Sequence, residues 1–506
     1  MGTEVELKLA TSKAGLRDAL AQPWLRRMAG DALRKQHLVS LYFDTRDLAL
    51  RAHGVSLRVR RIGDRHLQTI KAKSTGSIAR GEWEVQIDSD WPKLELARHT
   101  ALAPVLTDDI AQHLEPVFET CVERTVLPLR VGHSQIELAI DDARIATPDS
   151  SVDIAEIEIE LKQGEPGDVA WIARKLARRV PVTLGVRAKA DWGYGLLEAS
   201  INAPSSAEAV ALAPSGTVAD AFAEIGFSCL RQIAGNEFSV LRSDPDGIHQ
   251  MRIGLRRLRA ALSLFKGVLQ DTERNRFKRE LIWLTEQLGP ARDIDVFISK
   301  TVQPYLERHP ERREFDMLAH DLERERSREF ARARVAVESA RFRRLLVDCA
   351  LWLIDGAWRN DNDDLKRVLR ERAARAFAEE ELARRTGKIV KRVHKLERLD
   401  AASRHKLRIA VKKVRYGREF FASLTSGRAR RKAHRKLDRA LKDLKSVLGS
   451  LNDARVHAQF ARRFVAASAV SRKAFALGCL IGREQARQKE LLREAVAAGK
   501  LLKKTA

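Results

Sequence analysis

The sequence has few cysteines and no long apolar run, and both shortages exclude classes of protein. Cys121, Cys229, Cys349 and Cys479 are far apart and form no CxxC pair, which argues against zinc fingers and against a disulfide framework. Apolar stretches such as "ALWLI" are too short to span a bilayer, and acids stand where a signal peptide would begin with basic residues. We therefore expect a protein of the reducing cytoplasm with no membrane partner.

Charge is abundant but unevenly divided along the chain. Residues 1–203 hold 28 Lys and Arg against 29 Asp and Glu, whereas residues 204–506 hold the other 65 and 39, a net charge of +26. Such an excess attracts polyanions through counterion release and electrostatic steering, without selecting among DNA, RNA, polyphosphate and acidic lipid. We expect a phosphate-rich partner to bind the second half of the chain.

The two halves also differ in the period of their apolar residues. The first half alternates with a period of about two, as in "VELKL", "VSLRVR" and "IAEIEIEL", with helical patterns near 13–29 and 168–179. The second half repeats with a period of about 3.6 and is rich in Ala, Leu, Arg and Glu. We predict an α+β domain of antiparallel strands at 1–203, a linker at 204–216 and an all-α domain at 217–506.

The helical half contains an internal repeat. "HQMRIGLRRLRAAL" at 249–262 matches "HKLRIAVKKVRYGR" at 405–418. Further on, "LGPARDIDVF" from residue 288 matches "LGSLNDARVH" from residue 448. Because both landmarks recur in the same order and at nearly the same separation, we infer a duplicated helical unit.

Acids and bases alternate with apolar residues on several strands of the first half. Alternate side chains share one face of a strand, so Glu4, Glu6 and Lys8 project together. A solvated sheet face would explain any single strand. Many strands carry both signs of charge, however, which favours the lining of a closed tunnel. Such a tunnel suits a triphosphate, since carboxylates bind Mg²⁺ or Mn²⁺ while Lys and Arg neutralise phosphate oxygens.

The opening "EVELK" resembles the ExExK signature of CYTH domains, also called triphosphate tunnel metalloenzymes. The likeness continues in order through "YFDT", "LRVR", "TIK", "GEWEV", "EIEIEL" and "RAKADWGYGL", and it covers residues 1–203. The resemblance implies an eight-stranded antiparallel β-tunnel. It also implies hydrolysis of inorganic triphosphate, or of a related triphosphate, with Mg²⁺ or Mn²⁺ as cofactor.

The same resemblance assigns roles to individual positions of this sequence. The catalytic residues would be Glu4, Glu6, Lys8 and Glu158. The metal ligands or water-positioning groups would be Glu4, Glu6, Asp141, Glu156, Glu158 and Glu160. The residues that hold phosphate oxygens would be Lys8, Arg58, Arg60, Lys71, Arg124 and Lys189. Glu82 and Glu84 would build the tunnel wall or contribute to metal binding.

The two repeated motifs place basic residues on one helical face. At about 100° per residue, His249, Arg252, Arg256 and Arg259 share a face beside an apolar stripe, and the second motif repeats the pattern. A solvated face would explain one such helix, but the repetition favours a shared role. Each histidine could equally pack or cap a helix. Metal binding is disfavoured because the neighbouring residues are cations.

These motifs resemble the CHAD domain, the conserved-histidine α-helical domain, across residues 217–506. The resemblance implies two pseudo-symmetric four-helix bundles around a basic groove that binds inorganic polyphosphate. The groove residues would be His249, Arg252, Arg256, Arg257, Arg259, His405, Arg408, Lys412, Lys413 and Arg415. Elementary chemistry agrees, because a polyanion without bases needs point charges rather than stacking aromatics, and aromatics make up 6% of the chain. Asp293 and Asp453 are expected to orient basic side chains or cap helices.

Four functional hypotheses follow. The first is a metal-dependent inorganic triphosphatase whose helical half binds polyphosphate. The second is a protein that captures triphosphate or polyphosphate without turnover. The third is a nucleic-acid-binding protein built on the basic half. The fourth, again an enzyme, is a class IV-type adenylate cyclase, which would use the same metal and phosphate groups.

Overall fold

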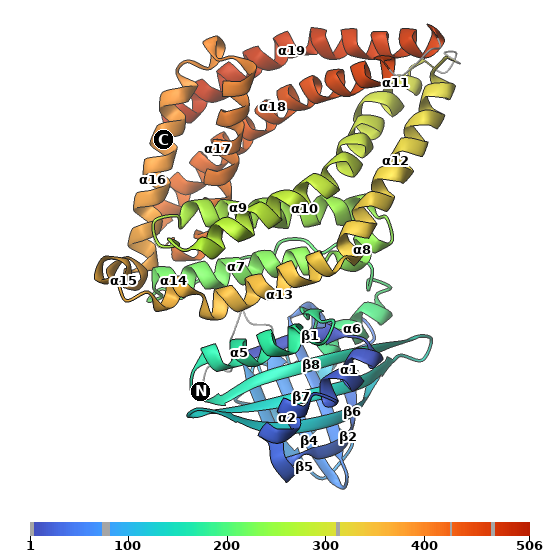
Figure 1. Cartoon of the computed structure of the whole chain (residues 1–506). Coiled ribbons are helices and arrows are strands. Elements are labelled where there is room, and N and C mark those ends of the chain that lie inside the picture. Colours follow the sequence, from blue (N-terminus) through green and yellow to red (C-terminus); the bar gives the residue numbers. More distant parts are fainter. Residues whose placement is uncertain (1–4, 73–80, 310–313, 426–427, 467–470, 506) are drawn as a thin grey trace. The chain divides into compact units, whose positions relative to one another are not determined.

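A computed structural model describes residues 5–72, 81–309, 314–425, 428–466 and 471–505 (Figure 1). The chain divides into two compact units. The first unit comprises Met1–Ala207, Leu230–Arg242 and Val337–Asn360. The second comprises Glu208–Cys229, Ser243–Ala336 and Asp361–Ala506. The first unit thus includes two segments from the half that we predicted to be helical, and the predicted boundaries at 203 and 217 stay predictions.

The first unit is built on one antiparallel sheet. In the described part of the chain its order is β5-β4-β3-β2-β6-β7-β8-β1-β9. The strands are β1 (Val5–Thr11), β2 (Arg34–Asp44), β3 (Val55–Ile62), β4 (Arg65–Ala72), β5 (Glu82–Ile87), β6 (Glu115–Val131), β7 (Ser134–Ala146), β8 (Ser151–Gln163) and β9 (Thr183–Leu184). Eight longer strands match the predicted number, and the two-residue β9 adds a ninth beside β1.

Helices cover the apolar face of this sheet. The predicted helix at 13–29 is two helices, α1 (Lys13–Leu20) and α2 (Pro23–Ala29), because Pro23 lacks an N–H and favours the first helical position. With α5 (Pro166–Ala177) they lie over β6, β7 and β8 in Figure 1. Under them lie fully buried residues such as Leu9, Ile157 and Ile159. The charged residues that alternate with these therefore point to the opposite face.

Shorter elements complete the first unit. They are η1 (Gly30–Ala32), α3 (Ala49–Ala52), η2 (Leu94–Ala97), α4 (Asp108–Gln112), α6 (Lys189–Leu197), α8 (Glu237–Leu241), α13 (Ala340–Asp355) and α14 (Ala357–Asn360). Helix α13 packs on α5 and β9. Helix α6 carries Lys189 as its first residue, so its start places a predicted phosphate ligand.

The second unit is helical throughout its described residues, apart from one isolated bridge between Thr217 and Ala373. Its larger helices are α9 (Pro245–Leu264), α10 (Thr272–Phe297), α12 (Glu314–Glu338), α16 (Ala374–Val393), α17 (Ala401–Phe420), α18 (Arg428–Ala466) and α19 (Ser471–Thr505). Its shorter elements are η3 (Ile298–Val302), α11 (Gln303–Leu306), α15 (Asp364–Glu371), η4 (Leu396–Arg398) and η5 (Ala422–Leu424), and α7 (Val218–Ala234) runs from this unit into the first.

The repeat is visible in how these helices pack. Helix α9 packs on α10, α17 packs on α18, and α9 meets α17. Both copies of the histidine motif therefore lie on the first helix of a pair, and both copies of the motif that begins at residues 288 and 448 lie on the second. None of the helices described is long and apolar enough to cross a membrane.

Candidate functional site

Six charged side chains meet on the inner face of the sheet, and we call them the charged cluster. They are Lys8, Arg124, Asp141, Glu156, Glu158 and Lys189. Strand pairing brings five of them together, since Arg124 lies opposite Asp141, Asp141 opposite Glu156, and Lys8 opposite Glu158. Residues more than a hundred positions apart thus become neighbours through register alone.

Every carboxylate of the charged cluster contacts a cation. Arg124 binds Asp141 with two hydrogen bonds of 2.8 and 2.6 Å, and its Nη2 also donates to Glu158 at 2.6 Å. Lys8 Nζ lies 2.5 Å from Glu158 Oε1. Lys189 donates to Glu156 and lies 2.7 Å from Asp141 Oδ2. The side chain of Asp141 is 0% exposed and that of Glu158 is 12% exposed, so these contacts are largely screened from water.

The cluster favours the charged forms of Lys8, Arg124, Glu158 and Lys189, whereas Glu156 is an exception. Burial would raise the pKa of Glu158, but Lys8, Lys189 and Arg124 outweigh it and hold that pKa well below its usual value. Burial would lower the pKa of Lys8, and the surrounding carboxylates reverse this and raise it. Glu156 is the exception, because burial raises its pKa more than its neighbouring cations lower it.

A second group of charges lies on β2 to β5. Register places Tyr42 opposite Arg58, and Lys71 opposite Glu82. Arg58 Nη1 donates to Tyr42 Oη at 3.4 Å, and Lys71 Nζ lies 2.8 Å from Glu82. The Nε atoms of Arg58 and Arg60 are buried and have no hydrogen-bond partner among the described residues. A buried donor without a partner costs about 1–3 kcal/mol, so this arrangement invites an acceptor from outside the chain.

The two charged groups face each other across the curved sheet. Burial and the charge of Arg58 lower the pKa of Lys71, and the more distant Lys8 on β1 lowers it further. Burial lowers the pKa of Arg60 to about 10, with contributions from Arg58 and from Arg124 on β6. Strands far apart in the sheet order feel each other's charges because the sheet curls. The result is an interior in which the charged cluster faces the group that contains Arg58, Arg60, Lys71 and Glu82.

The charged cluster also fits a divalent metal ion. One oxygen each from Asp141, Glu156 and Glu158 lies within 4.8 Å of the others, and within the described ranges no other residues form such a group. Carboxylate oxygens are the ligands that Mg²⁺ and Mn²⁺ prefer. Lys8 and Lys189 contact the same carboxylates, so a metal ion there would require these ammonium groups to turn toward another anion, such as phosphate.

The other predicted acids lie around this centre. Glu4 is outside the described residues. Glu6 and Glu160 face each other across β1 and β8; Glu6 lies 3.1 Å from Lys8, while Glu160 pairs with Lys162 at 2.6 Å. On β5, Glu84 accepts a hydrogen bond from Thr69 at 3.2 Å. The structure thus brings Glu6 to the edge of the cluster and pairs Glu160 with Lys162 instead of with a cation of the cluster.

A network that sequence patterns did not indicate holds Lys189 in place. Asp191, two residues along α6, accepts from the backbone N–H of Ala188 at 3.0 Å and from Arg51 Nη1 at 3.0 Å. Arg51 stacks on the ring of Tyr194, whose hydroxyl donates at 2.9 Å to the fully buried carboxylate of Asp44. Asp44 in turn accepts from the backbone of α3, so α3 and α6 are tied together.

In the second unit, the predicted basic residues of α9 and α17 gather on facing surfaces. The charge of Arg256 lowers pKa values on both helices. Burial, followed by the charges of Arg408 and Arg256, lowers the pKa of Lys412 to about 7. Burial likewise lowers the pKa of Arg252 to about 10, although Asp293, 3.6 Å away, opposes this. We call this set the basic surface: His249, Arg252, Arg256, Arg259, His405, Arg408, Lys412, Lys413 and Arg415.

Cations on the basic surface outnumber their acidic partners. Nε and Nη1 of Arg252 and Nε of Arg408 are buried with no hydrogen-bond partner among the residues described. Burial and the charges of Arg292 and Arg256 lower the pKa of His249 to about 4, so this imidazole is neutral near pH 7. Arg257 does not join the surface: its side chain is 0% exposed and lies 3.0 Å from Glu419.

Comparison with known proteins accounts for both units. The sequence matches the profile of the CHAD domain over residues 224–497, more than half of the chain. The chain belongs to the CHAD domain family. A second match, to the profile of the CYTH domain, covers residues 2–184. The suspected combination of a CYTH domain and a CHAD domain is therefore confirmed.

Two relatives illustrate the match. An inorganic triphosphatase from Haemophilus influenzae is 28% identical over 198 residues, 38% of this chain and 54% of that protein. The chain thus spans about half the length of this curated relative. The crystal structure of the CHAD domain from the plant Ricinus communis is 28% identical, with a TM-score of 0.51, and the match covers 59% of this chain and 96% of that chain.

Tyr42, Arg51 and Asp191 of the CYTH domain were not singled out from the sequence. Tyr42 occurs in the quoted "YFDT", but its contact with Arg58 depends on the β2–β3 register. Asp191 stands two residues after Lys189, so a search for acids near predicted ligands would have found it. Arg51 gives no local signal, because its partner is 140 residues away.

Proposed function

We propose that the CYTH domain hydrolyses inorganic triphosphate, or a related triphosphate, with Mg²⁺ or Mn²⁺, and that the CHAD domain binds inorganic polyphosphate. The observation that carries the first part is the charged cluster, in which three buried carboxylates and three cations share one interior with Arg58 and Arg60, whose buried Nε atoms have no hydrogen-bond partner among the described residues. The name of the Haemophilus influenzae relative supports the assignment.

The residues of the site suit phosphoanhydride hydrolysis, which depends on positioning and charge neutralisation. Asp141, Glu156 and Glu158 would hold the metal ion, which when bound neutralises phosphate charge and lowers the pKa of a bound water. Arg58 and Arg60 would bind phosphate oxygens through donors that have no other described partner. Lys8 and Lys189 would move from the carboxylates to the phosphate chain as the metal ion takes their place.

The remaining predicted residues take supporting roles in this proposal. Glu4 and Glu6 would complete the metal and water site, and Glu160 would act at its edge. Lys71 and Arg124 would neutralise phosphate charge from opposite sides. Arg257 would join α9 to α17 through Glu419 rather than bind phosphate.

The proposed polyphosphate site is the basic surface. Its cations form a row on two packed helices, and it offers buried donors without described partners at Arg252 and Arg408. A linear polyanion would supply one acceptor after another along such a row.

A substrate panel tests the first part of the proposal. The purified full chain is incubated with tripolyphosphate, ATP and thiamine triphosphate, each with Mg²⁺ or Mn²⁺, and orthophosphate and cyclic nucleotide are both measured. We expect orthophosphate from tripolyphosphate, only with added metal. Cyclic AMP from ATP would instead support the cyclase hypothesis, and binding without any product would support capture alone.

A competition assay tests the second part. We expect long-chain polyphosphate to displace bound DNA or RNA at far lower concentrations than nucleic acid displaces polyphosphate. The reverse order would contradict the proposal and favour a nucleic-acid-binding protein.

A further inference from the structure

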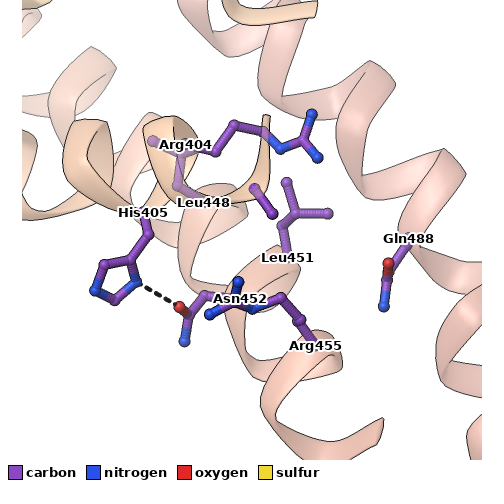
Figure 2. A pocket seen from close by; sticks show the side chains of 8 residues that line it. Arg404, His405, Leu448, Leu451, Asn452, Arg455 and Gln488 are labelled. Atoms are coloured by element: carbon purple, nitrogen blue, oxygen red, sulfur yellow. Dashed lines mark hydrogen bonds between the residues drawn. The ribbon is translucent and has the colours of Figure 1, made fainter. Parts of the chain in front are cut away.

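A pocket in the second half of the CHAD repeat has a composition that its counterpart in the first half lacks. It lies between α17, α18 and α19, and its polar lining consists of Arg404, His405, Asn452, Arg455 and Gln488 (Figure 2). Two leucines and an alanine complete the lining. Of these polar residues, His405 alone belongs to the basic surface.

The polar groups of this pocket include two guanidinium groups and no carboxylate among the described lining residues. His405 Nδ1 lies 2.8 Å from the amide oxygen of Asn452, which turns the amide NH₂ of Asn452 away from the imidazole, as Figure 2 shows. Arg404 Nη1 donates a hydrogen bond to the backbone oxygen of Leu399 at 2.6 Å. No ion pair of Arg455 is found within the described ranges. The Asn452 amide NH₂ donates to Asp453 at 3.5 Å, outside the lining, so the pocket is lined by two guanidinium groups and by no carboxylate among the described residues.

In the first half of the repeat, an acid of the chain itself neutralises the positive charge at the matching positions. The match of "LGPARDIDVF" with "LGSLNDARVH" aligns Arg292 with Asn452 and Asp295 with Arg455. There, Asp295 accepts from Arg292 at 2.8 Å and lies 3.4 Å from Arg326 of α12. An acid of the chain sits between two arginines in the first half, whereas an arginine replaces that acid in the second.

We propose that the pocket on α17, α18 and α19 binds one phosphate group, where the first half of the repeat uses the Asp295 carboxylate. The phosphate would be the end group of a polyphosphate chain or free orthophosphate. The pocket suits an end group because a terminal phosphate carries more negative charge and more free oxygens than an internal one. His405 joins the pocket to the basic surface, so a chain anchored there would continue along Arg408 and Lys412.

Binding of a chain end in this pocket rests on the proposed polyphosphate binding by the CHAD domain. Binding of free orthophosphate does not depend on it. Titration calorimetry on the full chain would use orthophosphate, long-chain polyphosphate with free ends, and the same polyphosphate with esterified ends. The variants are Arg404→Gln and Arg455→Gln, and Arg462→Gln, an exposed position on α18, is the matched control. The CYTH domain is the same in all of these variants, so differences between them isolate the pocket.

We expect Arg455→Gln and Arg404→Gln each to weaken binding of free-ended chains about ten-fold, the size of one charged hydrogen bond. Binding of end-esterified chains should not change, and Arg462→Gln should match the unmodified protein. A parallel loss for orthophosphate would identify free phosphate as a second ligand of the same pocket.

A second variant distinguishes the loss of a phosphate-binding group from the loss of the fold. Asn452→Arg combined with Arg455→Asp restores the ion pair of the first half, so it should fold normally and lose the end-group preference. Equal binding of free-ended and esterified chains by the unmodified protein, or unchanged binding in Arg455→Gln, would overturn the proposal. If long chains do not bind at all, polyphosphate binding by the CHAD domain is wrong. In that case the orthophosphate titration alone decides whether the pocket binds phosphate. Absence of orthophosphate binding would then overturn the proposal.

Discussion

Glu158 has the densest contacts of any acid in the charged cluster. It touches Lys8 at 2.5 Å, Arg124 at 2.6 Å and Lys189 at 3.2 Å. These cations keep its pKa well below the usual value, so it stays ionised across the physiological range. A carboxylate in this position organises the three cations that we propose to bind phosphate, while remaining available as an oxygen ligand.

A variant that displaces Lys189 without removing its charge would test whether side-chain placement, as well as charge, matters in the charged cluster. Asp191→Asn removes the charge that Arg51 contacts at 3.0 Å but keeps the side-chain size. We expect kcat for tripolyphosphate to fall about ten-fold with little change in KM, because a slightly misplaced cation is felt most in the transition state. Steady-state kinetics with Asp191→Asn and Arg51→Lys would measure this.

The matched control for this prediction is Glu198→Gln. Glu198 is the other acid near Arg51, at 3.8 Å, but it lies at the far end of α6 from Lys189. Its kinetics should stay within about two-fold of the unmodified protein, as for most surface changes. Equal losses in Asp191→Asn and Glu198→Gln would mean that the network stabilises α6 in general and does not position Lys189.

At the scale of single elements, the two halves of the CHAD repeat share a glycine whose surroundings differ. An added Cβ at Gly289 of α10 would lie 3.0 Å from Arg252 Nη1, whereas one at Gly449 of α18 would meet nothing within 4 Å. Gly449→Ala should therefore stabilise the protein by up to about 1 kcal/mol, the usual helix gain. Gly289→Ala should stabilise it less and weaken polyphosphate binding by displacing Arg252.

Thermal unfolding and titration with polyphosphate, run in parallel on Gly289→Ala and Gly449→Ala, would check this prediction. Similar polyphosphate affinities in the two variants would show that the position of Arg252 is not important for binding.

Lys412 makes the second helix of the basic surface sensitive to pH. Its pKa of about 7 means that it is charged below pH 7 and largely neutral above it in the free protein. Binding of a polyanion favours the charged form, so affinity should fall as the pH rises above 7. Lys412→Arg, which stays charged, should show a flatter pH profile between pH 6.5 and 8.5, because the arginine pKa lies above about 12.

Binding isotherms at several pH values, at fixed ionic strength, would measure this difference. Parallel pH profiles for the unmodified protein and Lys412→Arg would contradict it. Lys406→Arg is a suitable control, since Lys406 is exposed on α17 and lies outside the basic surface.

Element types could be predicted from the sequence, whereas most of the contacts could not. Alternation along "IAEIEIEL" predicts a strand with acids on one face, and the structure confirms β8. Partners such as Lys8 and Glu158 depend on register between strands 150 residues apart, which no local pattern encodes. Arg257 looks like its neighbours in a basic motif, and its burial depends on Glu419 of a helix far along the chain.

At the scale of the whole molecule, the charge division foreseen in the sequence matches the division of labour that we propose. The nearly neutral first part contains a site where acids and bases are paired one against another. The basic second part contains a surface on which buried donors of Arg252 and Arg408 have no hydrogen-bond partner among the described residues. Paired charges suit a site that binds a metal ion and an anion together, and unpaired cations suit an extended polyanion.

The most direct test of this account is orthophosphate release from tripolyphosphate by the full chain with Mg²⁺, compared between Glu158→Gln and Glu123→Gln. Glu123 precedes Arg124 on β6 but has a side chain 72% exposed, paired with His37 at 2.7 Å. We predict release by the unmodified protein and by Glu123→Gln, and a loss of at least about a hundred-fold in Glu158→Gln, as for other electrostatic groups of active sites. Equal release by the two variants, with folding intact, would contradict the proposal that the charged cluster is the catalytic centre.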